Sequence, residues 1–564
     1  MHPERIWFVL IGVFQGLFLL AAHEIIAGDV WSARHPLVVA WYAAVVGVPV
    51  ALELMLPEAE HRRLWRASAA LALVLLALGA YAGYAVGESG ASFFTFGVTV
   101  GVAWFVALPF IAIWARTGRL HFPYDQLFTD AWRNTLTLGL AALFTGVFWA
   151  LLALWAGLFK VIGVDFFATL FSKRQFIYPA TGLAFGVAIH LGHTHAGAVT
   201  TIRKVTLAAY RGLLPLLAVM VLLFLAFLPF TGLQPLWDTG RAAALLLATQ
   251  FVMILFVNAA YQDGTGEPPY SSLVRRIATA AIITLPVYSG LTLYALGLRV
   301  SQHGWTGTRV WAMLLAVIAA LYAMGYMAAA LERRQPWLRR VNRINVGMAL
   351  FVIGILVAAN TPLLDPMRIG AASQMTRLLD SDVPLEGFDY RYLRFDAGRY
   401  GIDALRRLSQ QPGTGPEANA IREAAAHALR QEHRWAIAPQ TGGADDQITL
   451  FPAGKQMDAA LAAFMASEMP RHSCPASRRA NCIMLAVDLN GDHEDEYVQF
   501  FYPFHVYARS QEGWRVAGRA TGSNGWNVSG VLTSLQEGAY GIVPPTWPVL
   551  KVGSDNWVVV EETE

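Results

Sequence analysis

The residues best suited to chemistry in this chain form an acidic stretch that directly follows an apolar run. Positions 1, 3, 5, 8 and 9 of the segment DLNGDHEDE are Asp488, Asn490, Asp492, Asp495 and Glu496. Oxygen ligands at this spacing suit a hard cation, because Ca²⁺ takes about six to eight oxygen atoms at about 2.3–2.6 Å. The sequence therefore predicts a Ca²⁺ site in a tight loop between two strands.

One position departs from the usual pattern of such loops. The segment resembles the short calcium loops of extracellular repeat and dockerin-like modules, but His493 stands where they have glycine. Glycine is favoured there because the backbone turns through positive φ, which histidine adopts at some cost. A complete EF-hand is not expected, since its twelfth position is Gln499 and not a bidentate glutamate. The alternative is a solvated acidic turn that joins two strands.

The only two cysteines of the chain lie shortly before the acidic stretch. Cys474 and Cys482 enclose the segment PASRRAN. We expect a disulfide between them if this part of the chain is in an oxidising compartment, because cytoplasmic cysteines usually stay reduced. The alternative is a pair of reduced, partly buried thiols, and the chain has no second pair of cysteines for a zinc site.

A second group of polar residues lies within apolar segments. His190 and His193 in IHLGHTH are three residues apart and would share a helical face, as two ligands of a transition metal would. Glu53 stands within VALELML. An ionisable residue in a membrane span indicates a functional site by default, but near a span end its side chain can also reach the interface simply to be solvated. Both interpretations stay open for these three residues.

Composition indicates what must position these residues. Of the 564 residues, 55% are hydrophobic and 14% are charged, and the mean hydropathy is +0.43. A helix needs about 20 apolar residues to cross the hydrocarbon core. We therefore expect about eleven transmembrane helices, near residues 6–26, 36–56, 67–87, 92–114, 133–159, 176–194, 210–231, 241–260, 277–298, 309–330 and 344–363.

The positions of arginine and lysine in the connections predict the orientation. The even-numbered connections contain fifteen of these residues, five of them between residues 333 and 343, and the odd-numbered ones contain seven. Because basic loops stay in the cytoplasm, the N-terminus is expected there, and eleven crossings then place the C-terminal part in the periplasm. A single miscounted span, most readily the sixth with its histidines or the long fifth, would reverse that placement.

The residues after the last span have the composition of a soluble domain. We expect helices near Gly401–Leu408 and Glu417–His433, and a third in QMDAALAAFMASEM. Alternating apolar residues predict strands in IMLAVDL, EYVQFFY, FHVYARS, WRVAGRA and DNWVVVEE, with a hairpin turn just before the fourth. The predicted fold is thus an all-α polytopic membrane domain, residues 1–364, followed by a periplasmic α+β domain, residues 365–564.

One segment carries a family resemblance. LPVYSGLTLYALGLRVSQHGWTGTRV, residues 285–310, is similar to a bacterial multi-pass family known only as domain of unknown function 4153, and so is FDYRYLRFDAGRYGIDALRRL, in which a short extended piece would lead into a helix. Gly307 stands where the family has proline. The residues that match are Pro286, Tyr294, Arg299, Gly304, Trp305, Thr306 and Arg309.

The resemblance implies an integral inner-membrane protein and brings no activity with it. Taken without the family, Trp305 is an interfacial anchor, Gly304 permits a turn, and Thr306 can cap a following helix. The alternative is a docking surface, in which Arg299 and Arg309 contact the C-terminal domain or a ligand.

No motif in the sequence indicates a reaction. Phosphate loops, nucleophile elbows, H-E-x-x-H and dinucleotide fingerprints are all missing, and a net charge of +3 without a basic aromatic patch argues against nucleic acid. We favour a non-enzymatic envelope protein whose periplasmic domain senses or binds a ligand or protein partner, in addition to contacts with the lipid bilayer. The alternatives are a secondary transporter or channel for a small solute, and a membrane enzyme acting on lipid or polysaccharide.

Overall fold

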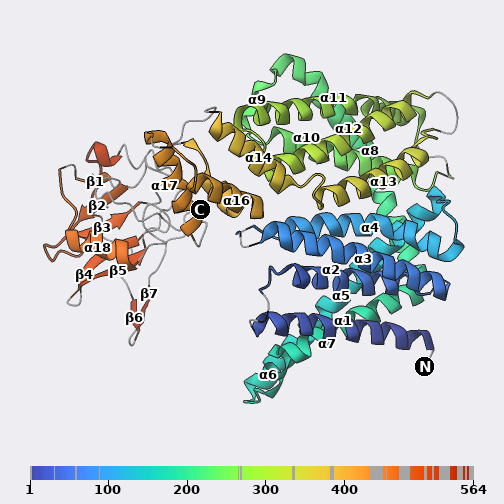
Figure 1. Cartoon of the computed structure of the whole chain (residues 1–564), viewed down its shortest axis with the longest axis horizontal. Coiled ribbons are helices and arrows are strands. Elements are labelled where there is room, and N and C mark those ends of the chain that lie inside the picture. Colours follow the sequence, from blue (N-terminus) through green and yellow to red (C-terminus); the bar gives the residue numbers. More distant parts are fainter. Residues whose placement is uncertain are drawn as a thin grey trace. The chain divides into compact units, whose positions relative to one another are not determined.

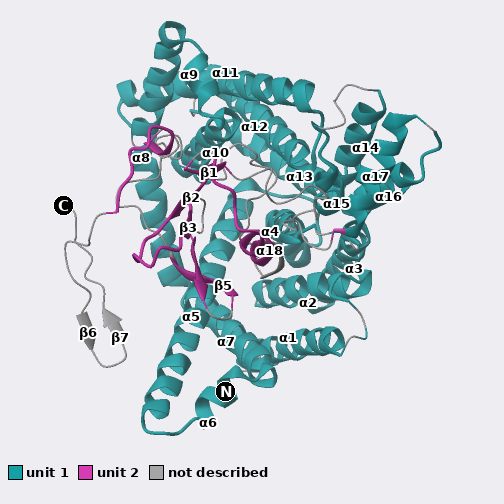
Figure 2. Cartoon of the chain, turned by 90° about the vertical axis from the view of Figure 1, so that its left-hand side faces the viewer, with its two compact units in different colours: residues 1–430 teal, residues 431–564 magenta. Residues whose placement is uncertain are grey.

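The computed structural model consists of a large helical unit and a smaller unit that contains a β-sheet (Figures 1 and 2). Unit 1 is Met1–Arg430 and unit 2 is Gln431–Glu564. The structure describes residues 3–28, 30, 32–57, 60–87, 89, 91–264, 266, 270–332, 337–380, 387–413, 415–431, 449–452, 454–468, 483–500, 505–510, 513–519, 534–542, 550–552 and 555–557. The predicted domain boundary at residue 364 lies inside unit 1 and stays a prediction.

Within the described residues, ten helices are long and apolar enough to cross a membrane. They are α1 (Pro3–Ala27), α2 (Pro36–Met55), α3 (His61–Val86), α4 (Phe94–Thr117), α5 (Tyr124–Val161), α8 (Ala196–Thr231), α10 (Ala242–Tyr261), α11 (Ser272–His303), α12 (Gly307–Leu331) and α13 (Val341–Ala359). Each coincides with a segment that the sequence predicts as a span, because an uninterrupted apolar run satisfies its backbone hydrogen bonds only as a helix. The predicted helical membrane region is therefore confirmed.

The outer surfaces of these helices are apolar. Leu151 and Leu154 on α5 are each 60% exposed, and Leu216 on α8 is 69% exposed. A surface of this kind is unfavourable in water and suits contact with lipid acyl chains. The chain is accordingly a multi-span membrane protein.

The eleventh predicted span is α7 (Arg174–Thr194), which is helical but less apolar than the other ten. It follows the short helix α6 (Phe166–Ser172) and packs against α1 and α5. A second short helix, α9 (Gln234–Asp238), lies between α8 and α10. Figure 1 shows α7 beside α1 in the first half of the bundle.

Two main cores stabilise the membrane region. One contains residues of α1 to α5 and α7, including Leu54, Leu64 and Ile189, and the other contains residues of α8 and α10 to α13, including Met253 and Tyr326. The first core lies around Glu53, His190 and His193, the polar residues that the sequence indicates within the spans.

Four helices follow the last span and still belong to unit 1. They are α14 (Pro366–Leu379), α15 (Tyr390–Phe395), α16 (Gly398–Ser409) and α17 (Pro416–Arg430), and they share a core around Leu393 and Leu405. The predicted helices near Gly401–Leu408 and Glu417–His433 are confirmed. The expected extended piece before the first of them is wrong, because the Asp389 side chain caps a short helix there by accepting from the Tyr392 N–H.

Unit 2 contains a five-stranded sheet in the order β1–β2–β3–β4–β5. Its strands are β1 (Thr449–Phe451), β2 (Ile483–Val487), β3 (Glu496–Gln499), β4 (His505–Ser510) and β5 (Gly513–Arg519), and the pair β6 (Leu550–Val552) and β7 (Asp555–Trp557) is separate. Helix α18 (Ala459–Glu468) shares a small core with the sheet through Leu461 and Met465. The predicted α+β composition of the C-terminal part is confirmed.

The sheet positions the acidic stretch. β2 and β3 pair antiparallel from Met484↔Gln499 to Val487↔Glu496, so residues 488–495 form the loop of a hairpin. β4 and β5 form the next hairpin, closed by the pair Ser510↔Gly513. The predicted arrangement of a loop between two strands is thus confirmed, whereas its ligand is a separate question.

Candidate functional site

Glycines bring α1 and α7 into close antiparallel contact. Gly12 meets Gly182, Gly16 meets the backbone at Tyr178, and Gly186 meets the backbone carbonyl of Phe8. A Cβ atom at any of these glycines would collide with the backbone of the opposite helix. Small residues of this kind let membrane helices approach closely, because backbone contact replaces the missing side chains.

Glu53 of α2 reaches this contact from the side. A Cβ atom on Gly186 would lie 2.8 Å from Glu53 Oε1, so the carboxyl group lies directly against the glycine. Glu53 is 0% exposed, and neither of its carboxyl oxygens has a hydrogen-bond partner among the described residues. The expectation that this side chain is solvated at the interface is wrong, because the core closes over it.

The two predicted histidines lie further along the same face of α7. The ring centroids of His190 and His193 are 5.1 and 5.8 Å from that of Phe8. Together with Glu53, they therefore surround the first turns of α1. The described residues contain no group of three His, Cys, Asp or Glu side chains that could hold a metal ion.

Next to this region, a buried ion pair joins α4 and α5. Asp130 on α5 is 4% exposed and binds the guanidinium groups of both Arg116 and Arg133. Two cations therefore compensate this carboxylate, whereas Glu53 has no such partner in the described residues.

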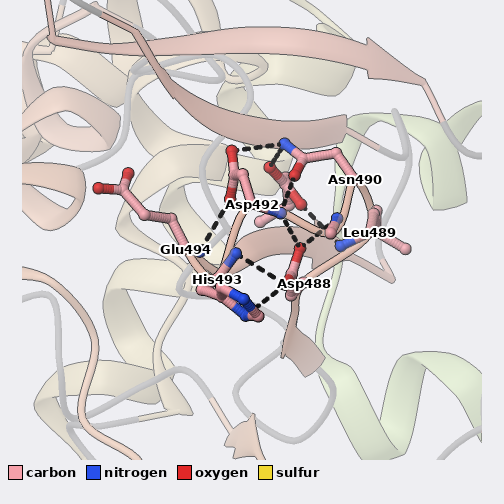
Figure 3. Close-up of polar contacts among 8 residues, drawn as sticks. Asp488, Leu489, Asn490, Asp492, His493 and Glu494 are labelled. Atoms are coloured by element: carbon pink, nitrogen blue, oxygen red, sulfur yellow. Dashed lines mark hydrogen bonds and ion pairs between the residues drawn. The ribbon is translucent and has the colours of Figure 1, made fainter.

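The acidic loop is organised around Asp488, as Figure 3 shows. Asp488 Oδ1 accepts hydrogen bonds from the Gly491 and Asp492 N–H groups, and Oδ2 accepts one from His493 N at 2.9 Å. The backbone of His493 has φ = +70°, the conformation for which glycine is expected. Histidine is tolerated there because the Asp488 carboxylate holds the turn.

The other side chains of the loop are also engaged. Glu496 is 6% exposed and accepts hydrogen bonds from Leu489 N and from the Asn490 side chain. The Asp495 carboxylate forms an ion pair with Lys455. The Asn490 side chain also bonds to Asp492, so a cation entering the loop would compete with these contacts.

Hydrogen bonding stabilises the charged form of Asp488. Although partial desolvation acts to raise it, the N–H groups of His493, Gly491 and Asp492 together lower the pKa of Asp488 below its ordinary value. The loop therefore presents an anionic carboxylate at neutral pH. Cys474 and Cys482, the predicted disulfide, lie outside the described residues.

The family-like segment forms the turn between α11 and α12. Thr306 caps α12 by accepting from Arg309 N, as predicted. Gly304 has φ = +69°, and a Cβ atom there would meet the side chains of Arg377 and Gln374. Glycine is thus required by the turn and also by the close approach of α14.

Residues after the last span dock onto this turn. Gln374 donates to the carbonyls of His303 and Trp305, and the Trp305 N–H donates to Ser373 Oγ at 3.0 Å. The Tyr392 hydroxyl accepts from the Gly307 N–H at 2.9 Å. Burial raises the pKa of Tyr392 to about 12, so this hydroxyl is neutral at physiological pH.

The remaining matched residues have local partners. Arg309 donates to the carbonyls of His303 and Gly304, and Arg299 donates to Gly240 O. Pro286 lies within α11, and Tyr294 is 55% exposed on the same helix. Arg309 therefore fixes the backbone at the C-terminal end of α11, and Arg299 joins that end to the connection between α9 and α10. The post-membrane helices α14 and α15 contact the turn through other residues.

Sequence reasoning missed two polar groups. Tyr81, Asp365 and Tyr400 form a hydrogen-bonded chain that links α3 to α14 and α16. In the second half of the bundle, Asn258, Tyr326, Asn345 and Tyr124 form a network that joins α10, α12, α13 and α5. For the network around Asn258, the only signal in the sequence is that polar residues interrupt apolar runs. Nothing in the sequence indicates which of these residues bond to one another.

Comparison with known proteins identifies the family but no activity. Residues 42–408 match the family described as a domain of unknown function (DUF4153). No curated protein and no solved structure matches the chain. The matched range contains Glu53, both histidines, the α11–α12 turn and the helices docked on it, while the acidic loop lies beyond it. Since the match covers more than half of the sequence, the chain belongs to the DUF4153 family.

Proposed function

We propose that the protein is an integral protein of the bacterial inner membrane that holds a C-terminal binding domain on the periplasmic side. The observation that carries this proposal is the docking of α14 and α15 onto the α11–α12 turn. Among the described residues, five hydrogen bonds join these helices to the α11–α12 region, with donors in Trp305, Gln374 (two), Arg377 and Gly307. The helices that directly follow the last span, which belong to unit 1, are thus fixed to the turn between two membrane helices.

The periplasmic placement depends on α7 as an eleventh span. Helix α7 contacts α1 along most of its length. At one end, His193 of α7 packs against Phe8 of α1, and at the other end the ring centroid of Tyr178 lies 5.7 Å from that of His23. Fifteen residues of helix correspond to about 22 Å, most of the hydrocarbon thickness. A helix that accompanies a spanning neighbour over this length crosses with it. Eleven crossings separate the N-terminus from α14 by one membrane.

Calcium would act in that compartment as a structural ligand of unit 2. Asp488, Asn490 and Asp492 offer side-chain oxygens from one hairpin loop, and the positive φ at His493 fits the turn of calcium loops. Asp495 would have to leave Lys455 to take part. The charge of Asp488 at neutral pH supports the choice of a hard cation. The binding surface itself would lie on the sheet that this hairpin helps to form.

Reporter fusions in the full chain test the placement. Alkaline phosphatase is active only in the periplasm, so a fusion after Glu564 is expected to be active. A matched fusion in the connection between α12 and α13, which contains the arginines at 333 and 334, is expected to be inactive. The opposite pattern would overturn the proposed orientation, and with it the periplasmic binding domain.

A second candidate, a secondary transporter or channel, is favoured by a different observation. Glu53 is a buried carboxyl group between helices of the membrane region and has no hydrogen-bond partner among the described residues, which is a frequent feature of ion-coupled transport. Uptake of a solute into vesicles containing the purified protein, dependent on an ion gradient and lost in Glu53→Gln, would favour transport over binding.

A further inference from the structure

The carboxyl of Glu53, which has no hydrogen-bond partner among the described residues, requires a ligand that these residues do not provide. Glu53 lies in the last turn of α2, where the carbonyl end of the helix dipole disfavours a negative charge. The side chain is fully enclosed, and an isolated carboxylate in such surroundings is costly unless a positive charge accompanies it. Either a proton or a cation must therefore occupy the site.

The described residues offer no set of side chains for a metal cation here, since they contain no group of three His, Cys, Asp or Glu that could hold one. Beside Gly186, which has no side chain, the structure places Glu53 Oε1 and the backbone carbonyl of Phe8, which lies within the helix α1. The flanking residues of α2, Leu52 and Leu54, are buried and apolar. Even Na⁺ or Mg²⁺ needs several oxygen ligands, and Ca²⁺ needs about six to eight. A proton needs only the carboxyl group.

Charged groups on the neighbouring helices are directed elsewhere. On α3, Arg63 pairs with Glu60, and Arg62 and Arg66 are exposed. On α4, Arg116 binds Asp130. On α1, the charged residue nearest to Phe8 is the exposed Arg5. The titratable groups that face this region are His190 and His193 of α7, which contact Phe8.

We propose that Glu53 is a proton-binding site inside the membrane region, closed by the glycine contact between α1 and α7. Gly186 is essential to the site, because a side chain there would displace the carboxyl group. Exchange of the proton requires α7 to move away from α1. This function is independent of what the C-terminal domain binds.

An apolar carbodiimide tests the proposal in native membranes. Dicyclohexylcarbodiimide reacts with protonated carboxyls in apolar surroundings: the carboxyl oxygen adds to the central carbon, its proton passes to nitrogen, and the adduct rearranges to a stable N-acylurea. Mass spectrometry of the full-length protein is expected to find one adduct on the peptide that contains Glu53. The adduct is expected to disappear in Glu53→Gln and to form more slowly as the pH rises. The exposed Glu24 serves as a matched control, because Glu24→Gln should leave the adduct in place.

Three outcomes would overturn the proposal. Glu53 that stays unmodified at mildly acidic pH would show that it holds no exchangeable proton. Modification that is independent of pH would show that the site does not titrate. Modification that Na⁺ or K⁺ suppresses at constant pH would show that a metal cation is the ligand. Because wild-type protein gives the primary result, none of these outcomes depends on whether the variants fold.

Discussion

The hydroxyl group of Tyr81, near the end of α3, donates a hydrogen bond to Asp365 Oδ2 at 2.6 Å, across 284 positions of sequence. The other oxygen of the same carboxylate caps α14 by accepting from the N–H groups of Met367 and Arg368. Tyr400 of α16 bonds to the same hydroxyl at 2.9 Å. One buried carboxylate thus starts the first post-membrane helix and also fixes it to the membrane region.

We predict that Tyr81→Phe loosens this attachment without unfolding the bundle. The substitution removes the hydrogen bond to the Asp365 carboxylate, which is worth about 1.5–3 kcal/mol, and also the bond with the Tyr400 hydroxyl. Hydrogen exchange of the purified protein in detergent is expected to increase in α14 and α16 and to stay unchanged in α10. Tyr84→Phe is the matched control, because its ring, and not its hydroxyl, contacts Arg399. Equal exchange in wild type and Tyr81→Phe would contradict the role given to this bond.

Gly370→Val is predicted to separate α14 from the α11–α12 turn. A Cβ atom at Gly370 would collide with the Tyr392 hydroxyl and lie 3.0 Å from Gly307 N. Valine is therefore expected to break the bond between Tyr392 and Gly307 and to lower the thermal stability measurably. Gly354→Val is the control, since nothing lies within 4 Å of its Cβ position. Similar melting temperatures for both variants would refute the close packing of this contact.

The buried ion pair of α4 and α5 is predicted to be critical for stability. Asp130→Ala leaves Arg116 and Arg133 without their carboxylate, and breaking a buried pair costs about 3–5 kcal/mol. Glu60→Ala removes the partner of Arg63 at an exposed site, where about 0–1 kcal/mol is expected. Thermal unfolding in detergent compares the two, and an equal effect would argue against the buried pair.

Calcium is predicted to raise the melting temperature of the C-terminal unit through Asp488 and Asp492. Asp492→Ala should remove the increase while changing the melting temperature in chelator only slightly. Glu494→Ala is the control, because only its backbone N–H takes part in the loop contacts. A shift of the same size with and without calcium would exclude the site.

Acid is predicted to weaken the β2–β3 hairpin. Because the native pKa of Asp488 lies below its unfolded value of about 3.9, this carboxylate contributes stability above that value. The contribution is lost as the pH falls through the lower native pKa. In the presence of a chelator, the melting temperature of Asp488→Asn should therefore fall less on acidification than that of the wild type. An unchanged pH dependence would show that the backbone contacts of Asp488 do not stabilise the loop.

Much of the fold follows from local properties of the sequence. The apolar runs predict the ten spanning helices, since an apolar segment of that length can satisfy its backbone in lipid only as a helix. The Thr306 cap and the hairpin around Asp488 also depend on neighbouring residues alone, and both were predictable. α7 was harder to assign, because its histidines lower its apolarity while contacts with another helix stabilise it.

Tertiary structure alone decided what the polar residues of the membrane region do. The sequence placed Glu53 and His190 near the ends of helices, where each side chain could be solvated, and did not indicate Tyr81 at all. Packing buries Glu53 against Gly186 and joins Tyr81 to Asp365, partners that lie more than 100 positions away. Local pattern cannot supply such pairs, because burial depends on which helices meet and a hydrogen bond depends on positions within a fraction of an ångström.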